Sequence, residues 1–256
     1  HMLLDETQNR LTIGDQKITV TGAISVDDAN LLAATTSGVV TATIAGTETV
    51  AELATLSADG GTNALSIVIR SDDATAATAA QLNTINAATA VAVNLTNVTG
   101  LAASSLSDLT DLATAINAGQ FSNAGGLTTI AVSDTTIDAT SLAARIDSYD
   151  AINGGSTTGM TLASGATINV DADEVDHMLL DETQNRLTIG DQKITVTNAI
   201  TVDQANLLGA TTSGKLTATI ATTETVTELA TLSADGGTNA LTIAIRAADA
   251  TAATAA

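Results

Sequence analysis

His1–Thr21 (HMLLDETQNRLTIGDQKITVT) and His177–Thr197 have the same amino-acid sequence. The similarity continues beyond this stretch, because 68 of the first 80 residues recur 176 positions later without a gap. Such an offset indicates tandem duplication, with a complete repeat unit at residues 1–176 and the first part of a second, near-identical unit at residues 177–256. Arrays of near-identical units typically extend a structure or present a surface, and they rarely catalyse reactions.

The composition limits the partners that the chain can have. It carries 28 acidic and 8 basic residues, and the net charge of −20 disfavours nucleic acid and anionic membranes as partners. Cations, including divalent ones, are the expected counter-partners. The chain contains no Cys, which excludes a disulfide framework and thiolate metal sites. No apolar run approaches the ~20 residues that a membrane-spanning helix needs, so we expect no membrane insertion.

Short β-branched runs alternate with Ala- and Leu-rich segments. Val39–Ile44 (VVTATI) has apolar residues at alternate positions, which predicts a strand. Leu101–Ala118 has Leu109, Leu112 and Ile116 three or four residues apart, which predicts a helix. Successive predicted strands lie about 25 residues apart, which is the spacing of a strand–helix unit whose strands pair in parallel. We therefore predict an α/β repeat: a solenoid of short parallel strands alternating with short Ala-rich helices.

The other strands predicted in the first copy are Lys17–Thr21, Leu65–Arg70, Ala90–Leu95, Leu127–Val132 and Thr167–Val170. Two alternatives stay open. Mostly-β repeat domains in tandem would keep the strands without regular helices. In addition, Arg10–Ile13 and Gln16–Val20 flank a Gly-Asp pair and could form a β-hairpin at the start of the unit.

Helix starts are marked by capping boxes, in which a hydroxyl residue precedes an acid or amide by three positions. The boxes pair Ser25 with Asp28, Thr49 with Glu52, Thr201 with Gln204 and Thr225 with Glu228. They predict helices that begin immediately after each hydroxyl residue.

Gly209–Lys215 (GATTSGK) is similar to the GxxxxGK phosphate-binding loop. That loop follows a strand, opens a helix and has Ser or Thr after its Lys. Here a predicted helix precedes the segment, a strand follows it, and Leu216 occupies the hydroxyl position. The first copy has Val39 in place of Lys215. We therefore interpret the segment as a helix-to-strand turn.

The densest acidic cluster is the segment DADEVD at residues 171–176. Calcium prefers six to eight oxygen ligands, which closely spaced carboxylates and carbonyls can supply. We take Asp171, Asp173 and Asp176 as candidate calcium ligands, and we also consider the segment a solvated acidic connection. The EF-hand spacing and the nonapeptide of calcium-binding β-rolls are absent.

The sequence contains no catalytic constellation. His1 and His177 occupy equivalent positions, so each repeat unit has a single His, and no GxSxG motif is present. We predict no catalytic or cofactor-binding residues and expect that the protein is not an enzyme.

Thr-x-Thr pairs occur on predicted strands, for example Thr41 with Thr43 and Thr217 with Thr219. Aligned ranks of such pairs could bind ice. However, Leu65–Arg70 (LSIVIR) lacks the pair, which interrupts the ranks. We favour the ordinary preference of Thr for strands as the explanation.

Ile24–Leu56 (ISVDDANLLAATTSGVVTATIAGTETVAELATL) and Leu241–Ala256 (LTIAIRAADATAATAA) resemble repeat regions of very large secreted or cell-surface proteins of bacteria. The resemblance implies an extracellular protein that acts as an adhesin, a biofilm component or a surface-layer or filament subunit. We therefore expect a structural repeat protein that forms a rod or filament on or from a bacterial cell surface. Two other classes stay open: a ligand-binding module for calcium, glycan or ice, and a viral fibre protein.

A solenoid cut within its array exposes an unpaired strand edge and an uncovered apolar layer. Asp249–Ala256 would form such an end, because its counterpart Asp73–Ala80 continues into further helical sequence. We predict head-to-tail self-association, weakened by polar substitutions at Leu241 and Ile243 in the last strand.

Overall fold

The computed structural model describes residues 13–57, 62–233 and 238–249. The chain divides into two compact units: unit 1 is His1–Ile130 with Ser148–Ser156, and unit 2 is Ala131–Asp147 with Thr157–Ala256. The joint between the two sequence copies, after residue 176, lies inside unit 2. Expectations for residues 1–12 and 250–256, which include most of Arg10–Ile13 and of Asp249–Ala256, fall outside the described residues.

Unit 1 alternates strands and helices. Its strands are β1 (Ile18–Ile24), β2 (Val40–Ile44), β3 (Ala64–Ser66), β4 (Val93–Asn94), β5 (Gly100–Ser104) and β6 (Phe121–Ser122). Its helices are α2 (Val26–Thr35), α3 (Val50–Leu53), α4 (Ala79–Ala87) and α5 (Leu106–Asn117), with a 3-10 turn η1 (Ser71–Asp73). Strands β1, β2 and β3 form one sheet in chain order, and β4 pairs with β6. All of these pairings are parallel.

Unit 2 has the same kind of architecture. Its strands are β8 (Thr136–Asp138), β9 (Gly159–Leu162), β10 (Thr167–Asp171), β11 (Leu187–Thr188), β12 (Lys193–Ile200), β13 (Leu216–Ile220) and β14 (Ala240–Thr242). Its helical segments are η2 (Ala172–Glu174), α7 (Val175–Thr183), α8 (Val202–Thr211), α9 (Val226–Leu229) and η3 (Ala247–Asp249). Strand β7 (Thr129–Val132) and helix α6 (Ala139–Ile152) have residues in both units.

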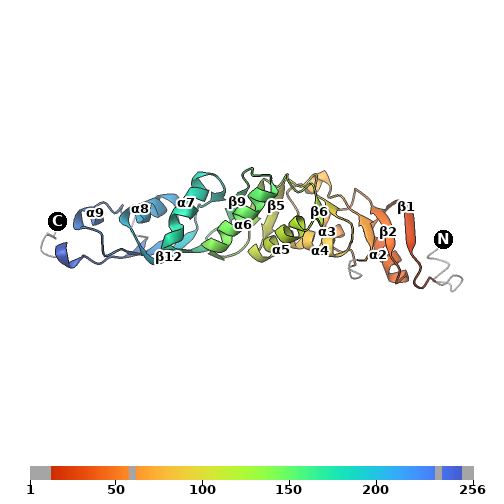
Figure 1. Cartoon of the computed structure of the whole chain (residues 1–256), viewed down its shortest axis with the longest axis horizontal. Helices are drawn as coiled ribbons and strands as arrows, with labels where there is room; N and C mark the ends of the chain where they lie inside the picture. Colours follow the sequence, from red (N-terminus) through yellow and green to blue (C-terminus); the bar gives the residue numbers. More distant parts are fainter. Residues whose placement is uncertain (1–12, 58–61, 234–237, 250–256) are drawn as a thin grey trace. The chain divides into compact units, whose positions relative to one another are not determined.

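The main sheet of unit 2 has the order β14-β13-β12-β10-β8, so its strands follow chain order from one edge to the other. A separate parallel pairing joins β9 to β11. Figure 1 shows α7, α8 and α9 along one side of unit 2, with β12 along the other. The α/β class with parallel sheets is therefore confirmed.

The register of this sheet builds a continuous rank of aliphatic side chains. Ile137 lies opposite Ile168, Ile168 opposite Ile194, and Ile194 opposite Leu216. All four side chains are completely buried. Paired residues of neighbouring strands are 22 to 31 positions apart in the sequence: Leu216 follows Ile194 by 22 residues, and Ile168 follows Ile137 by 31. The residues from one strand to its parallel neighbour are called a coil below.

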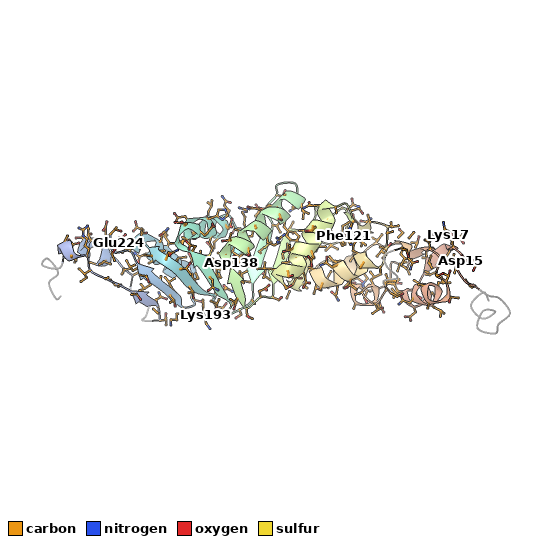
Figure 2. All side chains as sticks on the ribbon, turned by 60° about the horizontal axis from the view of Figure 1, so that its bottom comes forward. Asp15, Lys17, Phe121, Asp138, Lys193 and Glu224 are labelled. Carbon is orange, nitrogen blue, oxygen red and sulfur yellow. The ribbon has the colours of Figure 1, made fainter. Side chains whose placement is uncertain are left out.

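The core consists of small aliphatic side chains, because the chain has one Phe and one Tyr. Both aromatic residues are buried, and the Tyr149 hydroxyl donates to the Leu109 carbonyl oxygen at 3.0 Å. Charged residues such as Lys17, Asp138 and Lys193 lie on the surface (Figure 2). Aliphatic side chains therefore make up nearly all of the buried core.

Polar side chains join each coil to the next, and they do so equivalently in the two copies. The backbone N–H of Val40 donates to Asn63 Oδ1 at 2.9 Å, and Leu216 donates to Asn239 in the same way at 2.9 Å. The Thr36 hydroxyl donates to the Gln16 carbonyl oxygen at 2.6 Å, and Thr212 contacts the corresponding part of the second copy. We call these contacts inter-coil hydrogen bonds.

The structure corrects the predictions of one helix and of the hairpin, and it tests the four predicted capping boxes. The helix predicted at Leu101–Ala118 begins only at Leu106, because Ser105 caps it by accepting from the Asp108 backbone N–H at 3.1 Å, and the preceding residues form β5. The hairpin alternative is wrong in the second copy, where β11 pairs with β9 and β12 pairs with β10 and β13. The capping boxes at Thr49, Thr201 and Thr225 are confirmed, and Ser25 caps α2 through the Asp28 N–H.

Candidate functional site

The acidic segment at residues 171–176 connects β10 to α7. Asp171 Oδ1 accepts from the backbone N–H of Asp173 at 3.2 Å. Its other oxygen accepts from the Thr197 hydroxyl at 3.1 Å and from Asn198 Nδ2 at 2.7 Å, both on the next coil. The hydrogen bond from Asp173, followed by that from Thr197, lowers the pKa of Asp171 below its ordinary value of 3.8. Asp171 therefore links two coils as an ionised acceptor.

The other two candidate ligands point to different partners. Asp176 Oδ1 accepts from Gln204 Nε2 at 3.1 Å, whereas Asp173 is exposed and contributes its backbone N–H to Asp171. Within residues 13–57, 62–233 and 238–249, no group of three or more His, Cys, Asp and Glu side chains is placed to hold a metal ion. The structure thus does not gather Asp171, Asp173 and Asp176 into one ligand set, and calcium binding stays a prediction.

A buried ion pair that sequence reasoning missed lies next to this segment. Asp181 is 1% exposed, and its Oδ1 accepts from the Arg186 guanidinium at 2.8 Å. Arg186 also pairs with Asp147, and His177 Nδ1 lies 3.8 Å from Asp181 Oδ2. The spacing Asp-x-x-x-x-Arg recurs at residues 5 and 10 of the first copy, which is the signal that could have revealed the pair. The contacts join α6, α7 and the start of β11.

A second ion pair closes the coil that follows β3. Asp73, 7% exposed, accepts from Arg70 Nε at 2.9 Å and from the Val50 backbone N–H at 2.8 Å. The second copy repeats the pair with Arg246 and Asp249, and the hydrogen bond from Arg246 lowers the pKa of Asp249. The Asp73 carboxylate thus accepts a hydrogen bond from the first N–H of helix α3, which belongs to the neighbouring coil. This role is structural.

The segment that is similar to a phosphate-binding loop is a helix-to-strand turn. It begins in the last turn of α8 and leads into β13, which is the reverse of the order that phosphate binding needs. A Cβ atom added to Gly214 would collide with the Gln192 carbonyl oxygen, and one added to Gly38 would collide with that of Gln16. Glycine is needed because the turn packs against the backbone of the preceding coil.

The exposed Thr residues do not form complete ranks. Thr19 lies opposite Thr41, but Thr41 lies opposite Ala64. In the second copy Thr217 lies opposite Ala240. An ice-binding face needs aligned hydroxyls. Ala interrupts the rank of Thr41 and that of Thr217, whereas Thr43 lies opposite Ser66 and Thr219 opposite Thr242.

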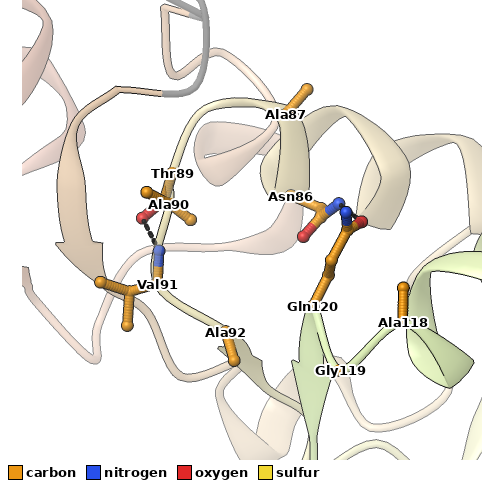
Figure 3. A pocket seen from close by; sticks show the side chains of 9 residues that line it. All are labelled: Asn86, Ala87, Thr89, Ala90, Val91, Ala92, Ala118, Gly119 and Gln120. Atoms are coloured by element: carbon orange, nitrogen blue, oxygen red, sulfur yellow. Dashed lines mark hydrogen bonds between the residues drawn. The ribbon is translucent and has the colours of Figure 1, made fainter.

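Unit 1 contains a surface groove of about 490 Å³ between the end of α4 and the turn that precedes β6 (Figure 3). Asn86 Nδ2 donates to Gln120 Oε1 at 2.8 Å across the groove, and the Val91 N–H donates to the Thr89 hydroxyl at 3.1 Å. The described residues that line it include no charged and no aromatic side chain. The groove thus offers amides and small apolar surfaces, without an acid, a base or a stacking platform.

The part of the chain that the structure describes contains no helix long and apolar enough to cross a bilayer. Comparison of the chain with protein-family models, with curated proteins and with solved structures found no match. Features shared by the two copies are the hydrogen bonds that join successive coils and the ion pair within a coil of Arg70 with Asp73 and of Arg246 with Asp249.

Proposed function

We propose that this chain is a structural, non-enzymatic repeat protein that forms a rod or filament on, or extending from, a bacterial cell surface, of adhesin, biofilm or surface-layer type. One observation carries the proposal. Within each unit, parallel strands pair in chain order, and the same inter-coil hydrogen bonds recur in both sequence copies. This architecture supports extension by addition of coils.

Differences between the two copies support the same conclusion. The residues that differ include several that change polarity or charge, and these are solvent-accessible: Val39 is Lys215 in the second copy, and Asp28 is Gln204. Three residues that join coils in both copies are identical, namely Asn30 and Asn206, Thr36 and Thr212, and Asn63 and Asn239. Two that join coils in the second copy, Asn198 and Gln204, are Gly22 and Asp28 in the first. The duplicated unit thus retains the buried or half-buried Asn and Thr contacts between coils, while contacts on the surface vary.

The contacts of Asn30 illustrate how coils are joined on the helix side. Asn30 Nδ2 donates to the Thr55 carbonyl oxygen at 3.0 Å, and Asn30 Oδ1 accepts from the Ser57 N–H at 2.8 Å. Asn206 makes the same two contacts with Thr231 and Ser233, at 3.0 and 2.8 Å. Side-chain amides therefore join the helix of one coil to the end of the next.

We propose that the coils stack as a solenoid, with a parallel sheet on one side and short helices on the other. Neighbouring strands of a sheet lie about 4.7–4.9 Å apart. In such a stack each coil contacts only its neighbours, so the length of the structure depends on the number of coils. A chain built in this way can form a long structure whose core contains mainly small aliphatic side chains.

The polar clusters of the structure are consistent with a scaffold. The carboxylates of Asp73 and Asp181 are bound by Arg70 and Arg186, and the first also accepts from a backbone N–H. The extracellular location rests on the resemblance to surface proteins of bacteria, which share the acidic, Cys-free composition of this chain.

Small-angle X-ray scattering on the full chain tests the shape. A compact globule of 256 residues has a radius of gyration of about 18 Å. At a concentration low enough for the chain to be monomeric, we expect a larger value and a pair-distance distribution with a long tail. A compact, nearly spherical particle would contradict the solenoid.

The location is tested separately on cells of the source bacterium. Antibodies raised against the chain should label intact cells or the surrounding matrix as strongly as permeabilised cells. Labelling that requires permeabilisation would contradict the cell-surface function while leaving the solenoid intact.

A further inference from the structure

The end of the first sequence copy and the opening of the second meet within unit 2, where their side chains bond each other. Three residues of this opening bond the preceding copy and recur unchanged at positions 10, 15 and 16: Arg186, Asp191 and Gln192. Their partners are the Asp147 carboxylate, the Gly165 N–H at 3.1 Å and the Ala163 carbonyl oxygen at 3.0 Å, respectively. These bonds do not distinguish the opening of one copy from that of the other.

Two further residues of the opening differ between the copies, and each of them bonds an acid at the end of the first copy. Asn198 Nδ2 donates to Asp171 Oδ2 at 2.7 Å. Gln204 Nε2 donates to Asp176 Oδ1 at 3.1 Å. The first copy has Gly and Asp at the two equivalent positions. Its opening therefore lacks both amide donors and has a carboxylate where Gln204 meets Asp176.

The local structure around these two positions requires neither difference. A Cβ atom added to Gly22, the counterpart of Asn198, would meet no atom within 4 Å, so a larger residue fits there. Asp28, the counterpart of Gln204, lies in the first turn of α2, and its backbone N–H donates to the Ser25 hydroxyl at 3.1 Å. An acid is thus compatible with the helix cap, and the reason for the two amides lies in the coil that precedes them.

The backbone of Asn198 supports this interpretation. Its φ of 66° lies in the left-handed region, which side chains with a Cβ rarely adopt. Glycine, the residue of the first copy, adopts this conformation without steric cost. Asn198 instead occupies it with its amide on the Asp171 carboxylate, and a hydrogen bond to a charged acceptor is stronger than a neutral one.

We infer that the acids at the end of one repeat unit select the opening of the unit that follows. Asn198 and Gln204 are the specificity residues, because they donate to Asp171 and Asp176. An acid in place of Gln204 removes one donor and brings a second negative charge toward Asp176, and like charges at close range repel. The inference rests on the proposed function, in which units follow one another in an array. Near-identical units are then not interchangeable, and their order is encoded in a few surface residues.

Thermal unfolding of four forms of the full chain tests the contact of Gln204: the unchanged chain, Gln204→Asp, Asp176→Asn and the double variant. Gln204→Asp should lower the melting temperature by about 1–4 °C. The same substitution should have little effect when Asp176→Asn is present, because the repulsion is then absent. Added salt should reduce the loss in Gln204→Asp, since it screens exposed charges.

Thr227→Asp is the matched control. Thr227 is exposed in the first turn of α9, so the substitution adds the same charge at a comparable place in a helix. Its effect on the melting temperature should be the same with and without Asp176→Asn. Hydrogen exchange of the β12 amides then locates the effect of Gln204→Asp at the junction between the copies.

A second cycle tests the contact of Asn198 with the variants Asn198→Gly, Asp171→Ala and their combination. Glycine relieves the left-handed backbone in both backgrounds, so the cycle isolates the hydrogen bond between the two side chains. Asn198→Gly should therefore lower the melting temperature more, by about 1–4 °C, in the chain that keeps Asp171 than in the chain with Asp171→Ala.

Additive effects in both cycles would overturn the inference, and so would a loss in Gln204→Asp that equals that of Thr227→Asp in every background. Additive cycles together with an elongated particle in scattering would reject the selection and leave the proposed function standing. A compact particle would reject the array and, with it, the ordering of units.

Discussion

Val40 donates its buried backbone N–H to Asn63 Oδ1, which lies 23 residues further along the chain, at a distance of 2.9 Å. Asn63 is itself 3% exposed. The pair joins two coils in a place that water does not reach, so neither group has an alternative partner in solvent.

We expect Asn63→Ala to lower the free energy of unfolding by about 1–3 kcal/mol, because the Val40 N–H would remain buried without an acceptor. Urea denaturation followed by circular dichroism measures the change. Asn239→Ala is the matched control: Asn239 bonds Leu216 in the same way but is only half-buried, so its loss should be smaller. Equal losses in both variants would contradict the role of burial.

Gly38→Ala should destabilise the chain by roughly 1–3 kcal/mol, because the new Cβ would collide with the Gln16 carbonyl oxygen of the preceding coil. Gly46→Thr is the control, because a Cβ at Gly46 meets no atom within 4 Å and the second copy has Thr222 at this position. Thermal unfolding of the two variants compares them directly. A tolerated Ala at position 38 would show that the turn can move away from the preceding coil.

The capping box of α3 gives the chain a dependence on pH. Hydrogen bonds from the Thr49 backbone N–H and then from its hydroxyl lower the pKa of Glu52 below its ordinary value of 4.5. Because the folded pKa is the lower one, the contribution of Glu52 to stability is complete above pH 4.5 and is lost as the pH falls through the folded pKa.

Glu52→Gln should therefore reduce the loss of stability at acidic pH while keeping the cap, since Gln204 fills the same role in the box of Thr201. Urea denaturation between about pH 3 and pH 7 measures the effect. Thr49→Ala, which removes the hydroxyl half of the cap, should lower stability across this whole range. If Glu52→Gln lost as much stability at acidic pH as the unchanged chain, Glu52 would not contribute to the pH dependence.

Divalent cations provide a test of the acidic segment. With a net charge of −20, the folded chain should gain stability from magnesium and calcium alike through screening. Melting temperatures measured with either ion should agree, and Asp173→Ala should not change this agreement. A rise specific to calcium that disappears in Asp173→Ala would instead establish Asp171–Asp176 as a calcium site.

Features that depend on neighbouring residues could be predicted from the sequence. The boxes at Thr49 and Thr225 were found because the hydroxyl and the acid that form each cap lie on the same turn. Strand β5 was missed because its short apolar stretch, GLAAS, fits either the period of a strand or the first turn of the helix that follows. Only the cap at Ser105 distinguishes the two.

Features that depend on distant residues could not be predicted. Asp181 pairs with Arg186, which is only five residues away in the sequence. Arg186 also pairs with Asp147, which lies 39 residues earlier. Likewise, the pairing of β11 with β9 rather than β12 depends on which strand lies beside it, and alternation of residue types carries no information on that choice. The candidate ligands Asp171 and Asp176 are close in sequence, yet each is bound by a different residue of the next coil.

Several residues that make inter-coil hydrogen bonds have their partners earlier in the chain. This order determines when a coil can form its contacts during synthesis. Thr36, Asn63, Thr89 and Ser104 find partners 20, 23, 24 and 25 residues earlier in the chain. A polypeptide that emerges from a ribosome or an export channel with its N-terminus first has already released those partners. Each coil can therefore close on its predecessor during synthesis or export, before later sequence has appeared.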